Sequence, residues 1–355
     1  MMAEAVTEER DPNVMYVGMD LGTYRASITA SNGIRKTVVS VVGWPKDDIS
    51  RKLLGKDIVF GHEAMKHRLA LNLVRPLEKG VIKYSDDSTL ASEEEIEIYK
   101  EAAKEIVKHA ITLAQHRSGQ TVYAVIGAPA QASVINKQSL IEAAMEAVDS
   151  VIVVSEPFSV AYGLDMLDDA LIIDIGAGTV DLCRMHGALP EEGDQITLTT
   201  AGDYVDELLL KLIKENHPDA QITINMARDI KERNGFVSDT NDRVVVRIPV
   251  EGRPRVIDIT EECKQACKAI VPPMIEAVGN LIATYDPEFQ ARIRNNIILA
   301  GGMSQLKGLD RLLEEGLEEF GGGKVCKVDE PVYAGADGAL KLAYDMPGAL
   351  WKELR

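Results

Sequence analysis

The sequence predicts an α/β protein of two related lobes, each with a central mixed sheet flanked by helices, that face each other across a cleft. The chain has 355 residues, enough for about two domains, and 46% of them are hydrophobic, so each domain can bury a core. Strand-like and helix-like segments alternate, a pattern that favours parallel strands covered by helices. One strand–turn motif also occurs twice, about one domain length apart.

The first half of the chain opens with a hairpin. Residues 15–20 and 25–30 are expected strands joined by a short turn, and residues 35–42 offer a third strand. Residues 43–80 contain short apolar pieces and several glycines, and they read as a small inserted subdomain. Ser92 and Glu95 form a capping box, which predicts the start of a helix that ends at Ser118-Gly119. We expect the later elements of this half to be a strand at 122–126, a helix at 140–148 and a strand at 151–154.

The second half begins with another hairpin and returns to alternating elements. We expect strands at 171–174, 180–185, 196–200, 243–250, 255–259, 297–300 and 326–328. We expect helices at 203–214, 224–233, 261–271, 306–320 and 332–344, and one more helix between Pro272-Pro273 and Tyr285.

Charge and composition exclude several classes of function. The net charge is −17, and an acidic surface repels both nucleic-acid backbones and anionic lipids, so we expect no direct nucleic-acid binding. The chain has no run of about 18 uninterrupted apolar residues, which argues against membrane insertion. Residues 1–14 lack the basic and apolar parts of a signal peptide, so we expect a cytoplasmic protein. The four cysteines form no Cys-x-x-Cys pair and are interpreted as packing thiols.

The duplicated motif carries the predicted chemistry. Residues 18–23 (GMDLGT) and 173–179 (IDIGAGT) each place an aspartate at the end of an apolar strand, followed by glycine and threonine. Glycines let backbone N–H groups approach an anion closely, and the threonine hydroxyls add donors. Asp20 and Asp174 would repel a bare phosphate, but they suit a phosphate that carries Mg²⁺, which binds oxygen ligands and keeps several waters. The alternative for each motif alone is an ordinary hairpin turn with a polar cap.

Two further motifs complete the candidate site. Residues 297–304 (IILAGGMS) join an apolar strand to paired glycines, against which a flat heterocycle can lie. Glu156 follows a buried strand, where its carboxylate could align a water with a terminal phosphate. The alternative for Glu156 is an acid that stabilises the start of a helix. A P-loop is excluded because Val325 stands where Ser or Thr is required, and the last glycine of the dinucleotide fingerprint is absent after Gly178.

In this order the motifs resemble those of the actin/sugar kinase/Hsp70 superfamily. The resemblance covers residues 15 to about 346 and implies an actin-like fold of two RNase H-like lobes with a nucleotide cleft between them. It implies a flexible tail at 1–14, lobe I at 15–165 plus 333–355 with a small subdomain at 43–80, and lobe II at 166–332 with a small subdomain at 202–268. Residues 122–148 and 332–342 are similar to the two connections between the lobes.

The resemblance assigns roles to residues that match the family motifs. It implies ATP or ADP and Mg²⁺ as cofactors, Glu156 and Asp174 as catalytic residues, and Asp20 and Asp174 as Mg²⁺ ligands through water. The implied nucleotide-binding residues are Asp20, Gly22, Thr23, Tyr24, Gly176, Gly178, Thr179, Gly202, Asp203, Lys231, Gly301, Gly302 and Met303, with Asp206 beside the turn at 202–203. Lys231 matches a lysine beside ribose and adenine, and its glutamate companion is expected to be replaced by Arg228.

Within the superfamily, the chain is too short for an Hsp70 with a substrate-binding domain. Residues 153–158 (VVSEPF) and 41–47 (VVGWPKD) resemble bacterial actin-like proteins that organise magnetosome chains in magnetotactic bacteria. This implies an ATPase that polymerises head-to-tail with itself into cytoskeletal filaments, with magnetosome-associated proteins as candidate partners. The alternatives are a metabolite kinase on the same scaffold, a non-hydrolysing nucleotide-dependent scaffold, and an MreB-like or plasmid-segregating actin homologue. Unlike membrane-bound MreB relatives, the chain starts with acidic and polar residues.

Overall fold

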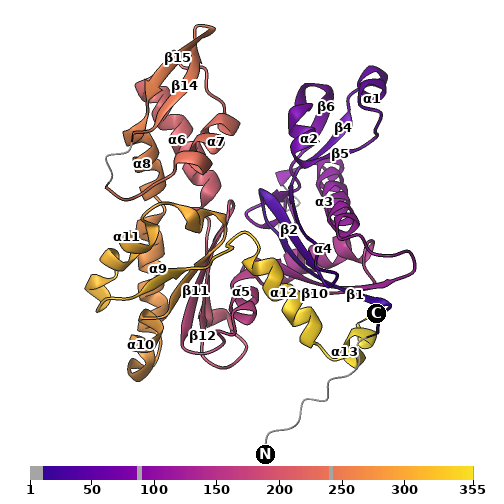
Figure 1. Cartoon of the computed structure of the whole chain (residues 1–355), viewed down its shortest axis with the longest axis vertical. Coiled ribbons are helices and arrows are strands. Elements are labelled where there is room, and N and C mark those ends of the chain that lie inside the picture. The colour runs from indigo at the N-terminus through magenta and orange to yellow at the C-terminus, as the bar shows by residue number, and fades with distance from the viewer. Residues whose placement is uncertain (1–10, 86–89, 240–242, 355) are drawn as a thin grey trace, which may run out of the picture.

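The computed structural model describes residues 11–85, 90–239 and 243–354. It consists of two lobes, each with a central five-stranded sheet (Figure 1). Most of the predicted N-terminal tail at 1–14 lies outside the described residues.

The first lobe contains a mixed sheet with the strand order β10-β9-β1-β2-β3. Strands β1, β9 and β10 run parallel, and the hairpin β1–β2–β3 is antiparallel. The strands are β1 (Val14–Leu21), β2 (Arg25–Ala30), β3 (Arg35–Val39), β9 (Thr121–Ala128) and β10 (Ser150–Ser155).

The second lobe repeats this topology with the order β13-β12-β11-β16-β17. Strands β11, β16 and β17 run parallel, and β11–β12–β13 is antiparallel. The strands are β11 (Ala170–Ile175), β12 (Val180–Met185), β13 (Gln195–Leu198), β16 (Ile297–Ala300) and β17 (Val325–Lys327). The two sheets therefore share both strand order and strand direction, as the duplicated sequence motif predicts.

Helices cover the first sheet. The long helix α3 (Glu93–Leu113) begins with the predicted capping box, in which the Ser92 hydroxyl accepts from Glu95 N–H and the Glu95 carboxylate accepts from Ser92 N–H. The buried face of α3 packs with β1 and β9 in one apolar core. The other helices are α4 (Val134–Met145) and α5 (Glu156–Gly163).

Residues 42–82 form short helices and strands, in the region where a small subdomain at 43–80 is expected. They comprise β4 (Val42–Pro45), α1 (Asp48–Leu54), β5 (Val59–Phe60), α2 (Gly61–Lys66), the 3₁₀ helix η1 (Arg68–Ala70), β6 (Leu71–Val74), β7 (Leu77–Glu78) and β8 (Val81–Ile82). The single strand predicted at 35–42 is wrong, because β3 ends at Val39. Ser40 interrupts it by donating its N–H to Tyr24 O and its hydroxyl to Gly22 O, 2.8 Å away in each case.

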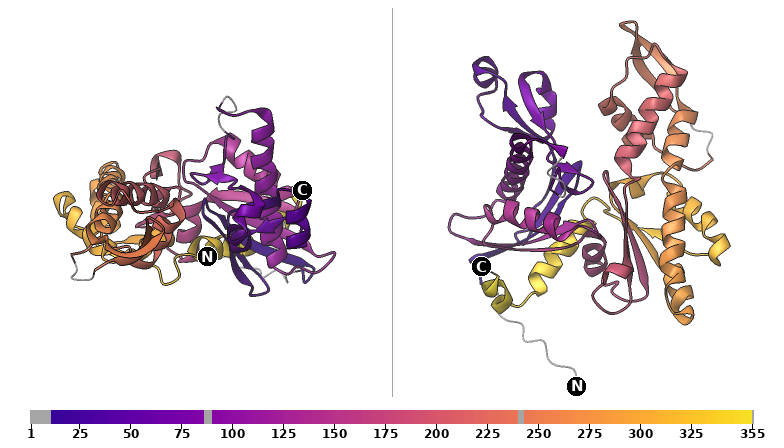
Figure 2. Two further views of the ribbon diagram at one scale, coloured as in Figure 1. Left: turned by 90° about the horizontal axis from the view of Figure 1, so that it is seen from above. Right: turned by 180° about the vertical axis from the view of Figure 1, so that it is seen from behind.

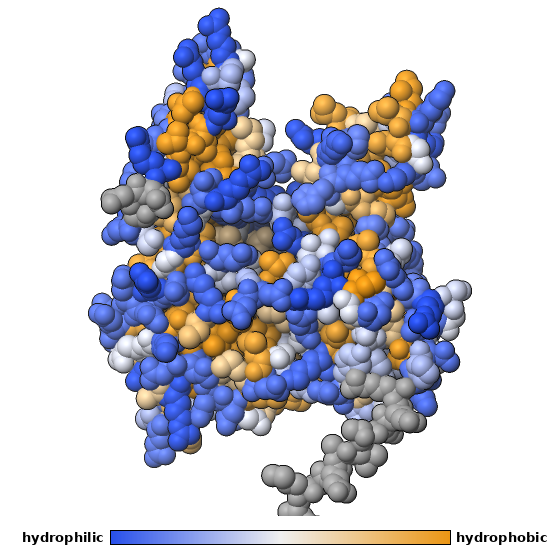
Figure 3. Space-filling model, in the orientation of Figure 1, coloured by the Kyte–Doolittle hydropathy of each residue, from blue (hydrophilic) through white to orange (hydrophobic). Residues whose placement is uncertain are grey.

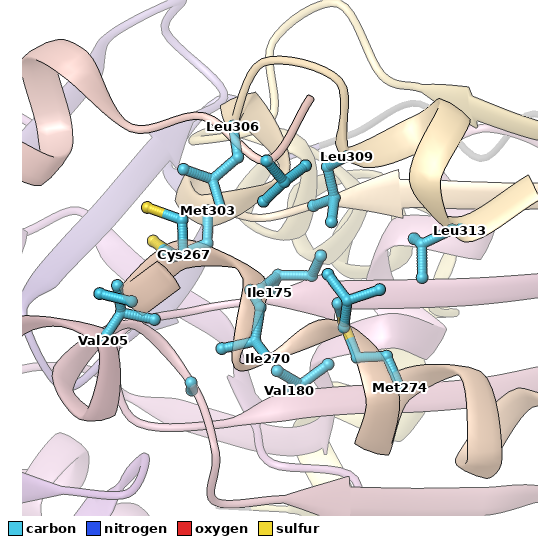
Figure 4. Close-up of a cluster of buried hydrophobic side chains, with 14 of the residues drawn as sticks. Ile175, Val180, Val205, Cys267, Ile270, Met274, Met303, Leu306, Leu309 and Leu313 are labelled. Carbon is cyan, nitrogen blue, oxygen red and sulfur yellow. The ribbon is translucent and has the colours of Figure 1, made fainter. Parts of the chain in front are cut away.

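Helices and a separate hairpin make up the rest of the second lobe. They are η3 (Glu192–Asp194), α6 (Gly202–Asn216), α7 (Ile224–Asn234), α8 (Thr260–Lys268), α9 (Val271–Ala283), α10 (Pro287–Arg294), α11 (Leu309–Gly316), η5 (Glu318–Phe320) and the hairpin β14 (Val245–Val250)–β15 (Arg253–Asp258). Figure 4 shows part of their core, with Cys267, Ile270 and Met274 facing Ile175. The stretch Thr260–Ala283 has the length and apolar composition of a membrane span, yet most of its apolar side chains belong to this core.

Two helices lie between the sheets, α5 and α12 (Ala334–Asp345), and α13 (Gly348–Glu353) follows at the end of the described chain (Figures 1 and 2). Helices α5 and α12 approach each other so closely that a Cβ added at Gly338 of α12 would lie 1.7 Å from the carbonyl oxygen of Ser159 in α5. A Cβ at Gly18 of β1 would lie 2.0 Å from Ala336 O of α12. Glycine at these positions therefore lets α12 lie against both α5 and the first sheet.

Candidate functional site

A cavity of about 280 Å³ lies between the lobes, where the two hairpin turns meet. Figure 3 shows a recess between the upper halves of the lobes, bordered mainly by hydrophilic residues. The predicted residues that line the cavity are Asp20, Gly22, Thr23, Tyr24, Glu156, Asp174, Gly176, Gly178, Thr179, Lys231, Gly301, Gly302 and Met303. Gly202 and Asp203 do not line it. They lie behind the second turn, where Gly202 N–H donates to Gly176 O and Asp203 N–H to Ala177 O.

The two turns contact each other directly. A Cβ added at Gly178 would lie 2.3 Å from the Thr23 hydroxyl oxygen, so only glycine fits there. The same hydroxyl accepts a hydrogen bond of 2.7 Å from Gly80 N–H, in the turn between β7 and β8. Gly80 lines the cavity, but sequence analysis did not select it, because nothing local to 77–82 indicates that this turn reaches the hairpin at 21–25.

Four carboxyl groups, those of Asp20, Glu156, Asp174 and Asp181, lie in or beside the cavity and make it electrostatically unusual. Burial, and then the charge of Asp181, raise the pKa of Asp20 from 3.8 to about 7. Burial and the neighbouring carboxylates also raise the pKa values of Asp174 and Glu156 well above their ordinary range. Like charges oppose one another's ionisation, whereas a nearby cation favours it. The cavity is therefore suited to a ligand that brings positive charge to these oxygens.

Asp181 is a member of this cluster that sequence analysis missed. It lies on β12 directly opposite Asp174 on β11. Its Oδ1 accepts from Ala130 N–H at 2.7 Å and from the Thr197 hydroxyl at 2.6 Å, so it links the loop after β9 to the second sheet. Asp181 lies two residues after Thr179, just outside the duplicated motif, and the first copy has Arg25 at the matching position.

Glu156 is both the residue that follows β10 and the first residue of α5. Its side chain is 8% exposed and lies against Gly127, where an added Cβ would be 3.1 Å from Glu156 Cγ. Its Oε1 is buried and has no hydrogen-bond partner in the described part of the chain. This oxygen is therefore available to a water or ligand in the cavity.

The α7 side of the cavity carries a buried ion-pair network. Lys231 Nζ lies 2.7 Å from Asp206 Oδ1 and donates to Gly202 O at 2.8 Å. Arg228 donates from Nε to Asp206 at 2.8 Å and from a terminal nitrogen to Asp203 at 2.9 Å. Burial raises the pKa of Asp206, and the Lys231 charge opposes this.

Arg228 stands where the resemblance places the glutamate companion of Lys231. The next residue, Glu232, lines the cavity together with Lys231 and Arg228, so a glutamate companion is available.

The paired glycines after β16 complete the cavity. Gly301 has φ of +75°, and an added Cβ would lie 2.3 Å from Asp174 Oδ1. Gly301 therefore lets the backbone turn beside the aspartate. Gly302 and Met303 belong to the 3₁₀ helix η4 (Gly302–Gln305), and Ser304 donates back to Gly301 O at 2.7 Å.

The carboxylates fit a cation held through water better than one held directly. Within residues 11–85, 90–239 and 243–354, no group of three or more His, Cys, Asp or Glu side chains is arranged to ligate a metal. Mg²⁺ usually keeps several waters and binds through one or two carboxylates together with phosphate oxygens. Asp20 and Asp174, each near the end of its strand, have the chemistry to hold Mg²⁺ through its water ligands in this way.

Comparison with known proteins establishes the family. The family model described as MreB/Mbl protein matches residues 14–347. The chain belongs to the MreB/Mbl family. This MreB/Mbl protein is 40% identical over 347 residues to the actin-like protein MamK of Paramagnetospirillum magneticum, with 98% of this chain and 97% of MamK covered.

Solved structures agree with this membership. The chain matches a MamK double helical filament with a TM-score of 0.89 and 40% identity, covering 94% of this chain and 100% of the other. It matches a non-polymerising MamK mutant bound to AMPPNP with a TM-score of 0.70 and 40% identity, covering 94% and 99%. These findings confirm the predicted actin-like fold and the resemblance to bacterial actin-like proteins.

Proposed function

We propose that this MreB/Mbl protein is an ATPase that polymerises into filaments and depolymerises after hydrolysis. The observation that carries the proposal is the convergence of Asp20 and Asp174, with their glycine turns, on one cavity between the lobes. Two findings on relatives support it, since MamK forms a double helical filament and a MamK mutant binds AMPPNP.

Different groups of the chain would hold different parts of the nucleotide. Backbone N–H groups of the turns at 21–24 and 176–179, with the Thr23 and Thr179 hydroxyls, would bind the phosphates of ATP or ADP. Gly301, Gly302 and Met303 would contact the base side, together with Lys231. One Mg²⁺, held through water by Asp20 and Asp174, would neutralise phosphate charge and lower the raised pKa values of the carboxyl groups.

Glu156 is proposed as the residue that orients the attacking water. Glu156 lines the cavity next to Gly127, and its Oε1 has no hydrogen-bond partner in the described part of the chain. An ionised carboxylate there accepts a hydrogen bond from water and can take a proton as the bond to phosphorus forms. Asp174 would act with it by holding the hydrated phosphate group in position.

The bound nucleotide would control filament assembly by favouring a closed or an open cleft between the lobes. Contacts from both turns to the same phosphates favour a closed cleft, and loss of the terminal phosphate removes part of them. Identical subunits that associate head-to-tail without closing a ring form a filament. By analogy with the relatives named MamK, we propose that this protein forms cytoplasmic filaments. These filaments would position magnetosomes with the help of magnetosome-associated proteins.

Co-sedimentation measured together with phosphate release tests the proposal. With Mg-ATP, we expect the protein to pellet above a critical concentration and phosphate release to rise with the pelleted fraction. With Mg-ADP, we expect the pelleted fraction to decline. Hydrolysis that requires an added metabolite, without pelleting at any protein concentration, would contradict the proposal and favour a metabolite kinase.

A further inference from the structure

Tyr24 lies at the end of the first turn, where the two lobes face each other above the cavity. The guanidinium carbon of Arg228, on α7 of the second lobe, lies 4.7 Å from the centre of the Tyr24 ring. Two arginines of the first lobe, Arg75 and Arg25, lie at 5.6 and 5.9 Å from the same centre. A cation within about 6 Å of an aromatic ring centre is attracted by the ring.

Arg228 is held rigidly on the second-lobe side. Its Nε and a terminal nitrogen donate to Asp206 and Asp203, and its side chain is only 11% exposed. Asp206 is fully buried and also pairs with Lys231. A guanidinium can use its N–H edge for carboxylates and leave its flat face for an aromatic ring. Arg228 therefore offers Tyr24 a fixed partner, not a mobile surface charge.

This contact joins the outer parts of the lobes, next to the packing of Thr23 against Gly178 of the second turn. Among the described residues, no hydrogen bond or ion pair joins residues 14–82 to residues 202–268. By contrast, the base of the cleft is tied by Asp181 to Ala130 and by Thr197 to Gln131. A rotation about that base moves the Tyr24–Arg228 pair more than the contacts at the base.

We propose that Tyr24 and Arg228 form a clasp that holds the cleft closed over bound nucleotide and sets the rate of nucleotide release. The inference rests on the proposed function for the identity of the ligand. Tyr24 and Arg228 act here as positioning residues, because closing the lobes keeps both glycine turns on the phosphates. The clasp opens when the lobes rotate apart, and Asp203 and Asp206 keep Arg228 in place for reclosure.

Dissociation of a fluorescent ADP analogue, chased with excess ATP in a stopped-flow instrument, tests the clasp. Tyr24→Leu removes the ring, and we expect release about 5- to 30-fold faster, the range that a cation–π contact supports. Tyr24→Phe restores an aromatic face, so release should return to within about threefold of wild type. Tyr285→Leu is the matched control, because Arg184 lies 5.0 Å from the Tyr285 ring within the second lobe alone. Equal release from Tyr24→Leu and wild type would overturn the proposal.

A double-mutant cycle separates the clasp from independent effects at each residue. If the two side chains act through each other, Tyr24→Leu combined with Arg228→Gln should release nucleotide no more than about twofold faster than the faster single variant. If the release rate of the double variant instead shows the product of the two single fold-changes, Tyr24 and Arg228 act separately. That result would contradict the clasp.

A distance measurement without nucleotide tests the clasp even if the proposed ligand is wrong. Spin labels can be attached at Leu53→Cys and Val256→Cys, exposed positions on the two outer subdomains, in a Cys326→Ser background. The other cysteines are buried. We expect Tyr24→Leu to lengthen and broaden the interlobe distance distribution, and Tyr285→Leu to leave it unchanged. Superimposable distributions for Tyr24→Leu and wild type would overturn the clasp, whereas failure of wild type to bind the ADP analogue would overturn only the proposed function.

Discussion

Asp20 and Asp174 occupy equivalent positions in two sheets of identical strand order. Asp20 pairs with Ser27 on the antiparallel neighbour β2 and with Gly127 on the parallel neighbour β9. Asp174 pairs with Asp181 on β12 and with Ala300 on β16 in the same arrangement. Each aspartate is next to last in its strand, so both reach the cavity between the lobes. The repeated topology thus places two matching carboxylates around one candidate ligand.

The carboxyl cluster predicts a pH-dependent stability in the absence of cations. Burial raises the pKa of Asp20 to about 7 from 3.8, so between these values the folded chain binds more protons than the unfolded chain. The free energy of unfolding therefore falls as pH rises through this window and levels off above about pH 7. In EDTA without nucleotide, we expect the unfolding temperature to drop by about 2–5 °C as the pH rises through this window.

Asp20→Asn removes one titrating group and relieves the repulsion between carboxylates. The unfolding temperature of this variant should therefore vary less with pH when it is measured by thermal unfolding under the same conditions. Asp219→Asn, at an exposed position, is the control and should keep the wild-type slope. Parallel pH profiles for Asp20→Asn and wild type would show that the cluster does not destabilise the folded chain.

Glu156→Gln should separate hydrolysis from assembly. The amide keeps the size of the side chain but cannot take a proton, so we expect phosphate release to fall about 100-fold. Filaments should still pellet with Mg-ATP and should persist after wild-type filaments have disassembled. Glu94→Gln, an exposed substitution of the same kind, should behave as wild type. Normal phosphate release in Glu156→Gln would remove this residue from the mechanism.

Gly178→Ala should weaken nucleotide binding by about 10-fold or more. Its Cβ would overlap the Thr23 hydroxyl and lie 2.8 Å from Lys79 Cα, so the two turns must move apart. Gly193→Ala is a suitable control, since an added Cβ there meets nothing within 4 Å. Titration with a fluorescent ATP analogue measures the change. Equal affinity in both variants would mean that the spacing of the turns is unimportant.

Gly338→Ala should destabilise the packing between α5 and α12. The added methyl group cannot fit 1.7 Å from Ser159 O without separating the helices. We expect a loss of about 1–3 kcal/mol in the free energy of unfolding, measured by urea denaturation. An unchanged urea midpoint would show that these helices can separate without loss of stability.

Much of the fold follows from local sequence patterns. The bounds of β2 and β16 and the capping box of α3 were predicted as found, because turn residues and apolar periodicity fix them locally. The duplicated motif predicted that Asp20 and Asp174 meet, because related topologies bring equivalent turns to a shared interface.

Features set by distant contacts could not be predicted in this way. Ser40 ends β3 by bonding to a turn sixteen or more residues earlier, and Gly80 reaches Thr23 from another hairpin. The predicted helix at 306–320 is wrong as a single element, because Gly308 has φ of +82° and α11 starts only at Leu309. Glu232 lines the cavity and Asp181 lies behind it opposite Asp174, and both placements depend on how distant parts of the chain pack together.

Isothermal titration calorimetry with Mg-AMPPNP tests most directly whether both turns bind one nucleotide. For the wild-type chain we expect saturable binding with one site per chain. Asp20→Asn and Asp174→Asn should each weaken that binding by about 10-fold or more, which corresponds to about 1.4 kcal/mol, while Asp219→Asn should not. No heat of binding in the wild type, or an affinity untouched by both substitutions in the cavity, would contradict the proposed site.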